Sequence, residues 1–151
     1  MSPADAAVIR RKLGHIAESL RALAPLADLS LDEYRRRLYE RKAAERLLHE
    51  AIEAALDINA HILAGHGGAV PEDYYSGFLA LAALGVLSQE LAEQLAPSAG
   101  LRNRLVHEYE GLDDERVRAA MATILDRYPR YVRAIETFLT RSADTNEPAS
   151  E

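Results

Sequence analysis

The chain has 151 residues, of which 48% are apolar and 28% are charged, and its formal net charge is −6. This size and balance indicate one globular domain with a core of its own, and the negative charge argues against a protein that coats nucleic acid through its overall field. The absence of cysteine excludes disulfides, thiolate metal sites and a cysteine nucleophile.

The sequence gives no sign of export or of a membrane. Residues 1–5 lack the basic and then apolar order of a signal peptide. The longest uncharged apolar run, Phe78 to Leu87, is half of the roughly 20 residues that cross a bilayer. We therefore expect a cytoplasmic protein.

The N-terminal segment predicts an amphipathic helix. Ser2 is a capping residue, Pro3 suits the first helical position, and Asp5 places an acid in the first turn. Apolar residues then recur at steps of three and four, as one face of a helix requires: Ile9, Leu13, Ile16, Leu20 and Leu23. Pro25 is expected to end this helix.

A second helix is predicted to be unusually long. Ser30 and Glu33 form a capping box, and no helix breaker follows before Gly65. The segment keeps the helical period over roughly 35 residues, or about 50 Å of axis. Its apolar stripe consists of Tyr34, Leu38, Leu48, Ile52, Leu56 and Ile62.

The second half predicts shorter elements and then one long helix. After a glycine-rich loop over 65–71, residues 74–84 form a short apolar helix, and Ser88 caps the next segment. Residues 97–100 interrupt it, and 101–109 add one or two turns. A last helix starts at Asp113 or Asp114, with a kink expected at Pro129. The apolar stripe of this helix consists of Val117, Met121, Ile124, Leu125, Tyr128, Ile135 and Leu139.

These elements predict an all-α fold, an antiparallel helical bundle with a long second helix. No segment has the alternation of a strand, and no linker divides the chain. The domain should cover residues 1–141, and the small polar residues of 142–151 should form a disordered tail.

Residues 102–109 combine four kinds of side chain that are useful in phosphate chemistry: guanidinium, carboxamide, imidazole and phenol. Helical geometry alone does not bring them together, because Arg102 and His107 lie about 140° apart around a straight helix. A purely structural interpretation is also open. In it Arg104 pairs with Glu108 on the surface, and His107 is an exposed polar residue.

The spacing Arg102-x4-His107-x-Tyr109 resembles the Arg-x4-His-x-Tyr signature of the HepT-like branch of the HEPN superfamily. The polar Asn103 directly after the arginine adds to the match. Tyr39 to Leu48 and Asp57 to Leu63 resemble the long second helix of that family, and Phe78 to Leu87 resembles its short helix and turn. The family consists of small all-helical, metal-independent RNases, commonly the toxin of a toxin–antitoxin pair.

The resemblance implies a mechanism without a cofactor. His107 would act as general acid or base, and Arg102 would bind the non-bridging phosphate oxygens. Asn103 would donate to a phosphate oxygen or orient His107. In the family, Tyr109 belongs to the site and is the residue that a nucleotidyltransferase antitoxin modifies with AMP. The family site forms at a two-fold dimer interface, so a homodimer or larger oligomer is implied.

Other residues offer weaker possibilities. Asp57 and His61 are an i,i+4 pair that could bind a metal or join the site from the second helix, although such a pair is more often a polar contact beside a core. Arginines at positions 35–37 and Arg41 could bind RNA phosphates or simply be solvated. The rings of residues 74 and 75 could stack on bases or pack at a helix end.

Two functions remain open. The protein is either an endoribonuclease toxin that an antitoxin neutralises, or a non-catalytic dimeric partner of a nucleotidyltransferase. The presence of Arg102, His107 and Tyr109 together favours the enzyme, whereas the negative net charge favours the partner.

Overall fold

The computed structural model describes residues 1–67, 71–107 and 112–146. In this part of the chain all regular structure is helical, which confirms the all-α prediction. The seven helices are α1 (Pro3–Ala27), α2 (Leu31–Arg36), α3 (Leu38–Gly65), α4 (Tyr74–Ala83), α5 (Gln89–Leu95), α6 (Ser98–His107) and α7 (Asp114–Asn146).

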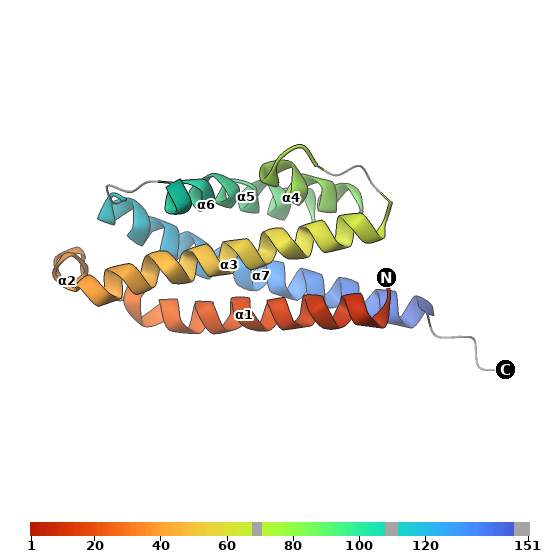
Figure 1. Ribbon diagram of the computed structural model, residues 1–151, viewed down its shortest axis with the longest axis horizontal. Helices are drawn as coiled ribbons and strands as arrows, with labels where there is room; N and C mark the ends of the chain where they lie inside the picture. The colour runs from red at the N-terminus through yellow and green to blue at the C-terminus, as the bar shows by residue number, and fades with distance from the viewer. Residues whose placement is uncertain (68–70, 108–111, 147–151) are drawn as a thin grey trace.

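Three long helices form the body of the bundle (Figure 1). α1 runs antiparallel to α3 and packs against both α3 and α7. The short helices α4 and α6 lie on the other side of α3, and α5 joins α4 to α7. α3 therefore lies at the centre, with the N-terminal helix on one side and the segment that carries residues 102–107 on the other.

The predicted apolar stripes line the core. Ile9, Ile16 and Leu23 of α1 are fully buried, as are the stripe residues Leu48, Ile52 and Ile62 of α3. One stripe residue was predicted wrongly, because Leu38 is 52% exposed at the start of α3. The buried side chains of α7 include two tyrosines, Tyr128 and Tyr131, whose hydroxyl groups bond inside the core.

The predicted helix caps are confirmed. The Ser2 hydroxyl accepts a bond from the Asp5 amide at 3.1 Å, and Ser30 accepts from Glu33 at 3.1 Å. Ser88 caps α5 through the Leu91 amide at the same distance. Each cap satisfies a backbone N–H that has no partner within the helix.

Two predicted helix ends were wrong. α1 continues through Pro25 to Ala27, because a proline near a C-terminus removes only one donor of the last turns. The long second helix breaks at Arg37, whose φ of −106° and ψ of 91° are extended. The break lets α2 turn and pack on α7, where Arg35 pairs with Asp114 at 3.9 Å.

The second half also differs in detail. α6 starts at Ser98, so the expected interruption over 97–100 is shorter than predicted. α7 is one helix through Pro129 and extends to Asn146, so residues 142–146 are helical and not part of a disordered tail. Residues 147–151 lie outside the described part of the chain. None of the described helices combines the length and apolar character needed to cross a membrane.

Candidate functional site

A buried serine anchors the helix that carries the motif. Ser98 begins α6, and its hydroxyl donates to the Leu95 carbonyl oxygen at 2.7 Å. Because that bond uses its single proton, the Tyr128 hydroxyl must be the donor in the 2.8 Å contact between the two side chains. α6 is thereby fixed to α7, and Arg102 lies one turn further on the same face.

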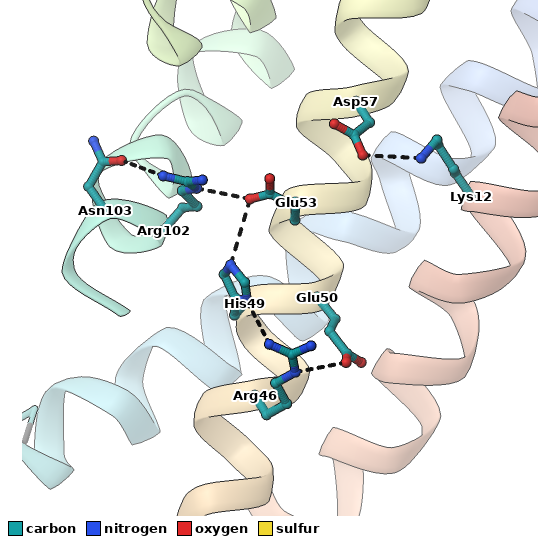
Figure 2. A network of polar contacts seen from close by, with 8 residues as sticks. All are labelled: Lys12, Arg46, His49, Glu50, Glu53, Asp57, Arg102 and Asn103. Atoms are coloured by element: carbon teal, nitrogen blue, oxygen red, sulfur yellow. Dashed lines mark hydrogen bonds and ion pairs between the residues drawn. The ribbon is translucent and has the colours of Figure 1, made fainter. Parts of the chain in front are cut away.

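Arg102 is held by groups from three helices. Its Nε donates to Glu53 Oε2 of α3 at 2.9 Å, and its Nη1 donates to Asn103 Oδ1 at 3.3 Å (Figure 2). Its Cζ lies 5.3 Å from the centre of the Tyr74 ring of α4, a cation–π contact. The hydrogen bond that Arg102 donates to Glu53 raises the pKa of Arg102 above its ordinary value. Among the described residues none accepts a hydrogen bond from Nη2, so that nitrogen is available to a ligand.

The polar contacts continue along α3. His49 Nε2 lies 3.7 Å from Glu53 Oε2, and His49 Nδ1 lies 3.5 Å from Arg46 Nη1 (Figure 2). A guanidinium has no lone pair to offer, so Nδ1 must accept, and the ring proton then lies on Nε2 and faces Glu53. Arg46 in turn donates to Glu50 Oε1 at 2.9 Å. Glu53 is thus the acid that joins Arg102 to a row of charges on α3.

The structure separates His107 from Arg102. His107 is the exposed last residue of α6, and within the described residues no hydrogen bond joins it to Arg102. This agrees with their separation around the helix. Arg104 is exposed and lines a different groove, between α6 and α7, together with Arg116 and Arg127.

Tyr109, the third residue of the motif, lies outside the described residues, and so does Glu108. The site prediction for Tyr109 and the alternative ion pair between Arg104 and Glu108 therefore both remain predictions.

Asp57 and His61 lie away from Arg102. Asp57 Oδ2 is 3.1 Å from Lys12 Nζ of α1, on the opposite side of α3 from α6 (Figure 2). His61 is exposed one turn further along α3. Over residues 1–67, 71–107 and 112–146, no three histidine, aspartate or glutamate side chains are grouped so that they could hold a metal ion.

An open cleft of about 700 Å³ lies between α3, α4 and α6. Tyr74 and Asn103, which both contact the Arg102 guanidinium, are among the residues that line it. Side chains of α3 and the start of α4 complete the wall, including Leu56, Asn59, Tyr74 and Tyr75.

The family can be assigned from the chain as a whole. The family model described as "Ribonuclease HepT-like" matches residues 16–135. The chain belongs to the HepT-like family. It is 37% identical over 147 residues to the tRNA nuclease HepT of Aphanizomenon flos-aquae (strain 2012/KM1/D3), a match that covers 97% of this chain and 100% of that relative.

Solved structures show the same fold. The HepT-like chain is similar to the tri-AMPylated Shewanella oneidensis HEPN toxin in complex with MNT antitoxin, with a TM-score of 0.77 and 22% identity over 91% of this chain and 99% of that one. It is also similar to YutE of Bacillus subtilis, a cytosolic protein of unknown function, with a TM-score of 0.78 and 18% identity over 94% and 93% of the two chains. The HEPN-like fold predicted from the motif is therefore confirmed.

The sequence analysis did not identify two residues of this candidate site, Glu53 and His49. His49 lies between Arg46 and Glu53 on one face of α3. Their spacing of three and four residues is visible in the sequence and could have indicated a polar row. The partner of that row, Arg102, could not be inferred from spacing.

Proposed function

We propose that this HepT-like protein is a metal-independent endoribonuclease, the toxin of a toxin–antitoxin pair, and that it acts in the cytoplasm. The observation that carries the proposal is Arg102, which is held in place by α3 and α4 and whose Nη2 donates to no residue that the structure describes. A fixed cation of this kind is suited to the negative charge that develops on a phosphate during cleavage.

The proposed reaction uses the nucleophile of RNA itself. The ribose 2′-oxygen attacks the adjacent phosphorus, the new O2′–P bond forms, and the P–O5′ bond breaks. One proton leaves the 2′-hydroxyl and one reaches the 5′-oxygen, which gives a 2′,3′-cyclic phosphate and a 5′-hydroxyl. His107 moves a proton at one of these oxygens, while Arg102 and Asn103 bind the non-bridging oxygens.

A second copy of the chain would complete the site. Arg102 and His107 face different directions on α6, so one α6 does not present both to the same phosphate. In a two-fold dimer the motif of one subunit would face that of its partner, and the arginine of one could act with the histidine of the other. The exposed position of His107 supports this arrangement.

The proposed regulator is a nucleotidyltransferase antitoxin. The similar Shewanella toxin is AMPylated and bound to an MNT antitoxin, and we propose that Tyr109 receives AMP here. The added phosphate would place negative charge near Arg102 and oppose the binding of RNA.

The test is cleavage of labelled RNA by the purified protein and by His107→Ala. The relative named as a tRNA nuclease makes tRNA the first substrate to try. Cleavage by the wild type and its loss in the variant are expected. A wild type that leaves tRNA and total RNA intact would contradict the proposal.

One observation favours a non-catalytic partner of a nucleotidyltransferase as the second function. The charge of Arg102 is already paired with Glu53 at 2.9 Å, which reduces its attraction for a phosphate. Such a protein would accept AMP from its partner enzyme but cleave no RNA, so incubation with that enzyme and labelled ATP, beside the cleavage assay, separates the two functions.

A further inference from the structure

The wall of the cleft near Arg102 contains a buried amide. Asn59 is 2% exposed, and its side-chain amide lies 2.6 Å from the Tyr131 hydroxyl, whose single proton is also within reach of the Ala55 carbonyl oxygen at 3.1 Å. Asn59 Nδ2 is covered by the surrounding protein, and either end of the amide can bond to Tyr131, so Asn59 contributes a polar group to the wall of the cleft.

Two aromatic rings form the wall of the same cleft. Tyr74 and Tyr75 begin α4, and their exposed fractions are 49% and 47%. Packing at a helix end would bury such rings further, so this exposure favours stacking over a purely structural role. The guanidinium of Arg102 lies over one face of the Tyr74 ring, with Cζ 5.3 Å from the ring centre. Surfaces of this kind bind nucleobases by stacking.

The charges around the cleft favour different positions for the base and the phosphate of a nucleotide. Glu72 and Asp73 line the cleft, and a hydrogen bond from the Ser76 backbone amide lowers the pKa of Asp73, so this carboxylate stays charged at neutral pH. Carboxylates disfavour a phosphate inside the cleft. The cation that attracts phosphate, Arg102, is not among the lining residues and bonds to Asn103, which is one of them.

We propose that this cleft binds a nucleobase of the RNA substrate, with its ring against the tyrosines beside the Asn59 side chain and its phosphate at Arg102. A volume of about 700 Å³ is within the range of small-molecule sites and is larger than one base needs. The inference rests on the proposed nuclease function. It adds that a nucleobase held in the cleft determines which phosphodiester bond of the RNA lies at the site.

A glycine offers a specific way to block the site without harming the fold. Gly77 of α4 lines the cleft, and a Cβ placed there would lie 3.9 Å from both Asn59 Cβ and Asn59 Nδ2, an ordinary contact. Gly77→Ala would thus add a methyl group to the wall of the cleft beside Asn59 while it favours the helix. Gly14→Ala in α1 is the matched control, because its Cβ would meet no atom within 4 Å.

The experiment measures binding of a fluorescein-labelled 2′-O-methyl RNA pentanucleotide by anisotropy, because this oligonucleotide lacks the attacking hydroxyl. A set of pentanucleotides with one abasic position each is compared with the intact one. We expect one abasic position to weaken binding to the wild type about tenfold, as the loss of a stacked base does. Gly77→Ala should bind the intact oligonucleotide about tenfold more weakly than the wild type and should not respond to that abasic position. Gly14→Ala should match the wild type.

Tyr75→Leu is a second variant that removes the aromatic face, and it too should lose the response to the abasic position. Equal binding of intact and abasic oligonucleotides by the wild type, or no binding of either, would overturn the inference. A full response in Gly77→Ala would also overturn it. Cleavage of natural RNA is assayed separately. Cleavage without base-dependent binding contradicts the nucleobase site alone, and base-dependent binding without cleavage contradicts the nuclease alone.

Discussion

Arg102 of α6 and Glu53 of α3 are 49 residues apart in the chain, and Nε of the arginine lies 2.9 Å from Oε2 of the glutamate. The arginine side chain is only 19% exposed, so the pair is partly shielded from water. The contact fixes the direction of the guanidinium and uses the hydrogen-bond donor of Nε, while Nη2 has no acceptor among the described residues. Glu53 is therefore a positioning residue for the cation of the motif.

Glu53→Ala should lower the rate of RNA cleavage about ten- to a hundredfold, because a misdirected cationic group stabilises the transition state poorly. The loss should fall mainly on kcat, and Glu53→Gln should restore much of it by accepting the same bond. Single-turnover kinetics on labelled RNA would measure both. Glu50→Ala is the control, since Glu50 pairs only with Arg46 on the same helix. Unchanged or faster cleavage by Glu53→Ala would show that this acid merely neutralises Arg102.

Arg102→Ala should reduce cleavage by about 10²–10³, the factor typical of losing one group that stabilises transition-state charge. Arg104→Ala should change it little, because Arg104 is exposed and lines the other groove. Its effect on the free energy of unfolding should be below about 1 kcal/mol. Comparable losses in both variants would mean that the motif spacing does not define the site. Thermal melts check that both proteins are folded.

Cleavage should persist in EDTA and leave a 2′,3′-cyclic phosphate or its 3′-phosphate product, because the proposed nucleophile is the hydroxyl of the substrate. Mass spectrometry of the cleaved ends would identify the product. Loss of activity with the chelator, and its recovery with a divalent ion, would point instead to a metal-dependent reaction.

The protein should be a homodimer or larger at micromolar concentration. Apolar surface is exposed beside His107, where Val106 is 37% exposed. Val106→Glu should therefore weaken the dimer and cleavage together. Leu38→Glu is the control, because Leu38 is 52% exposed at the start of α3, outside the motif. A monomeric wild type in sedimentation velocity would count against the shared site.

Stability should fall steeply in alkali. Burial raises the pKa of Tyr34 to about 12 and also raises the pKa values of Tyr128 and Tyr131. Below pH 10 all three are protonated in the folded and unfolded states, and their contribution is constant. Above pH 10 the unfolded chain releases these protons while the folded chain retains them, so the free energy of unfolding decreases by about 1.4 kcal/mol per pH unit for each tyrosine.

Urea denaturation at pH 8 to 11 would measure this slope. Tyr131→Phe should reduce it by the share of one tyrosine, whereas Tyr39→Phe should not change it, because Tyr39 is 86% exposed. A slope that is independent of Tyr131 would contradict the assigned cause.

The sequence by itself determined which segments are helical, which apolar residues of each helix are buried, and the family. Helix caps such as Ser30 and Ser88 act within four residues, and the stripe of Ile9, Leu13 and Ile16 reflects the period of one helix. Both are local relations, so spacing along the chain is enough to read them. The spacing of Arg102, His107 and Tyr109 indicated the family in the same way.

Only the tertiary structure decided which side chains from distant parts of the chain are in contact. The break at Arg37 follows from the packing of α2 on α7, and the buried Asn59 side chain meets the Tyr131 hydroxyl, 72 residues away. The 24 acidic residues of the chain look alike in the sequence. Glu53 differs from the others because α6 lies across α3 at that turn, and helix packing of this kind depends on side chains far apart in the chain.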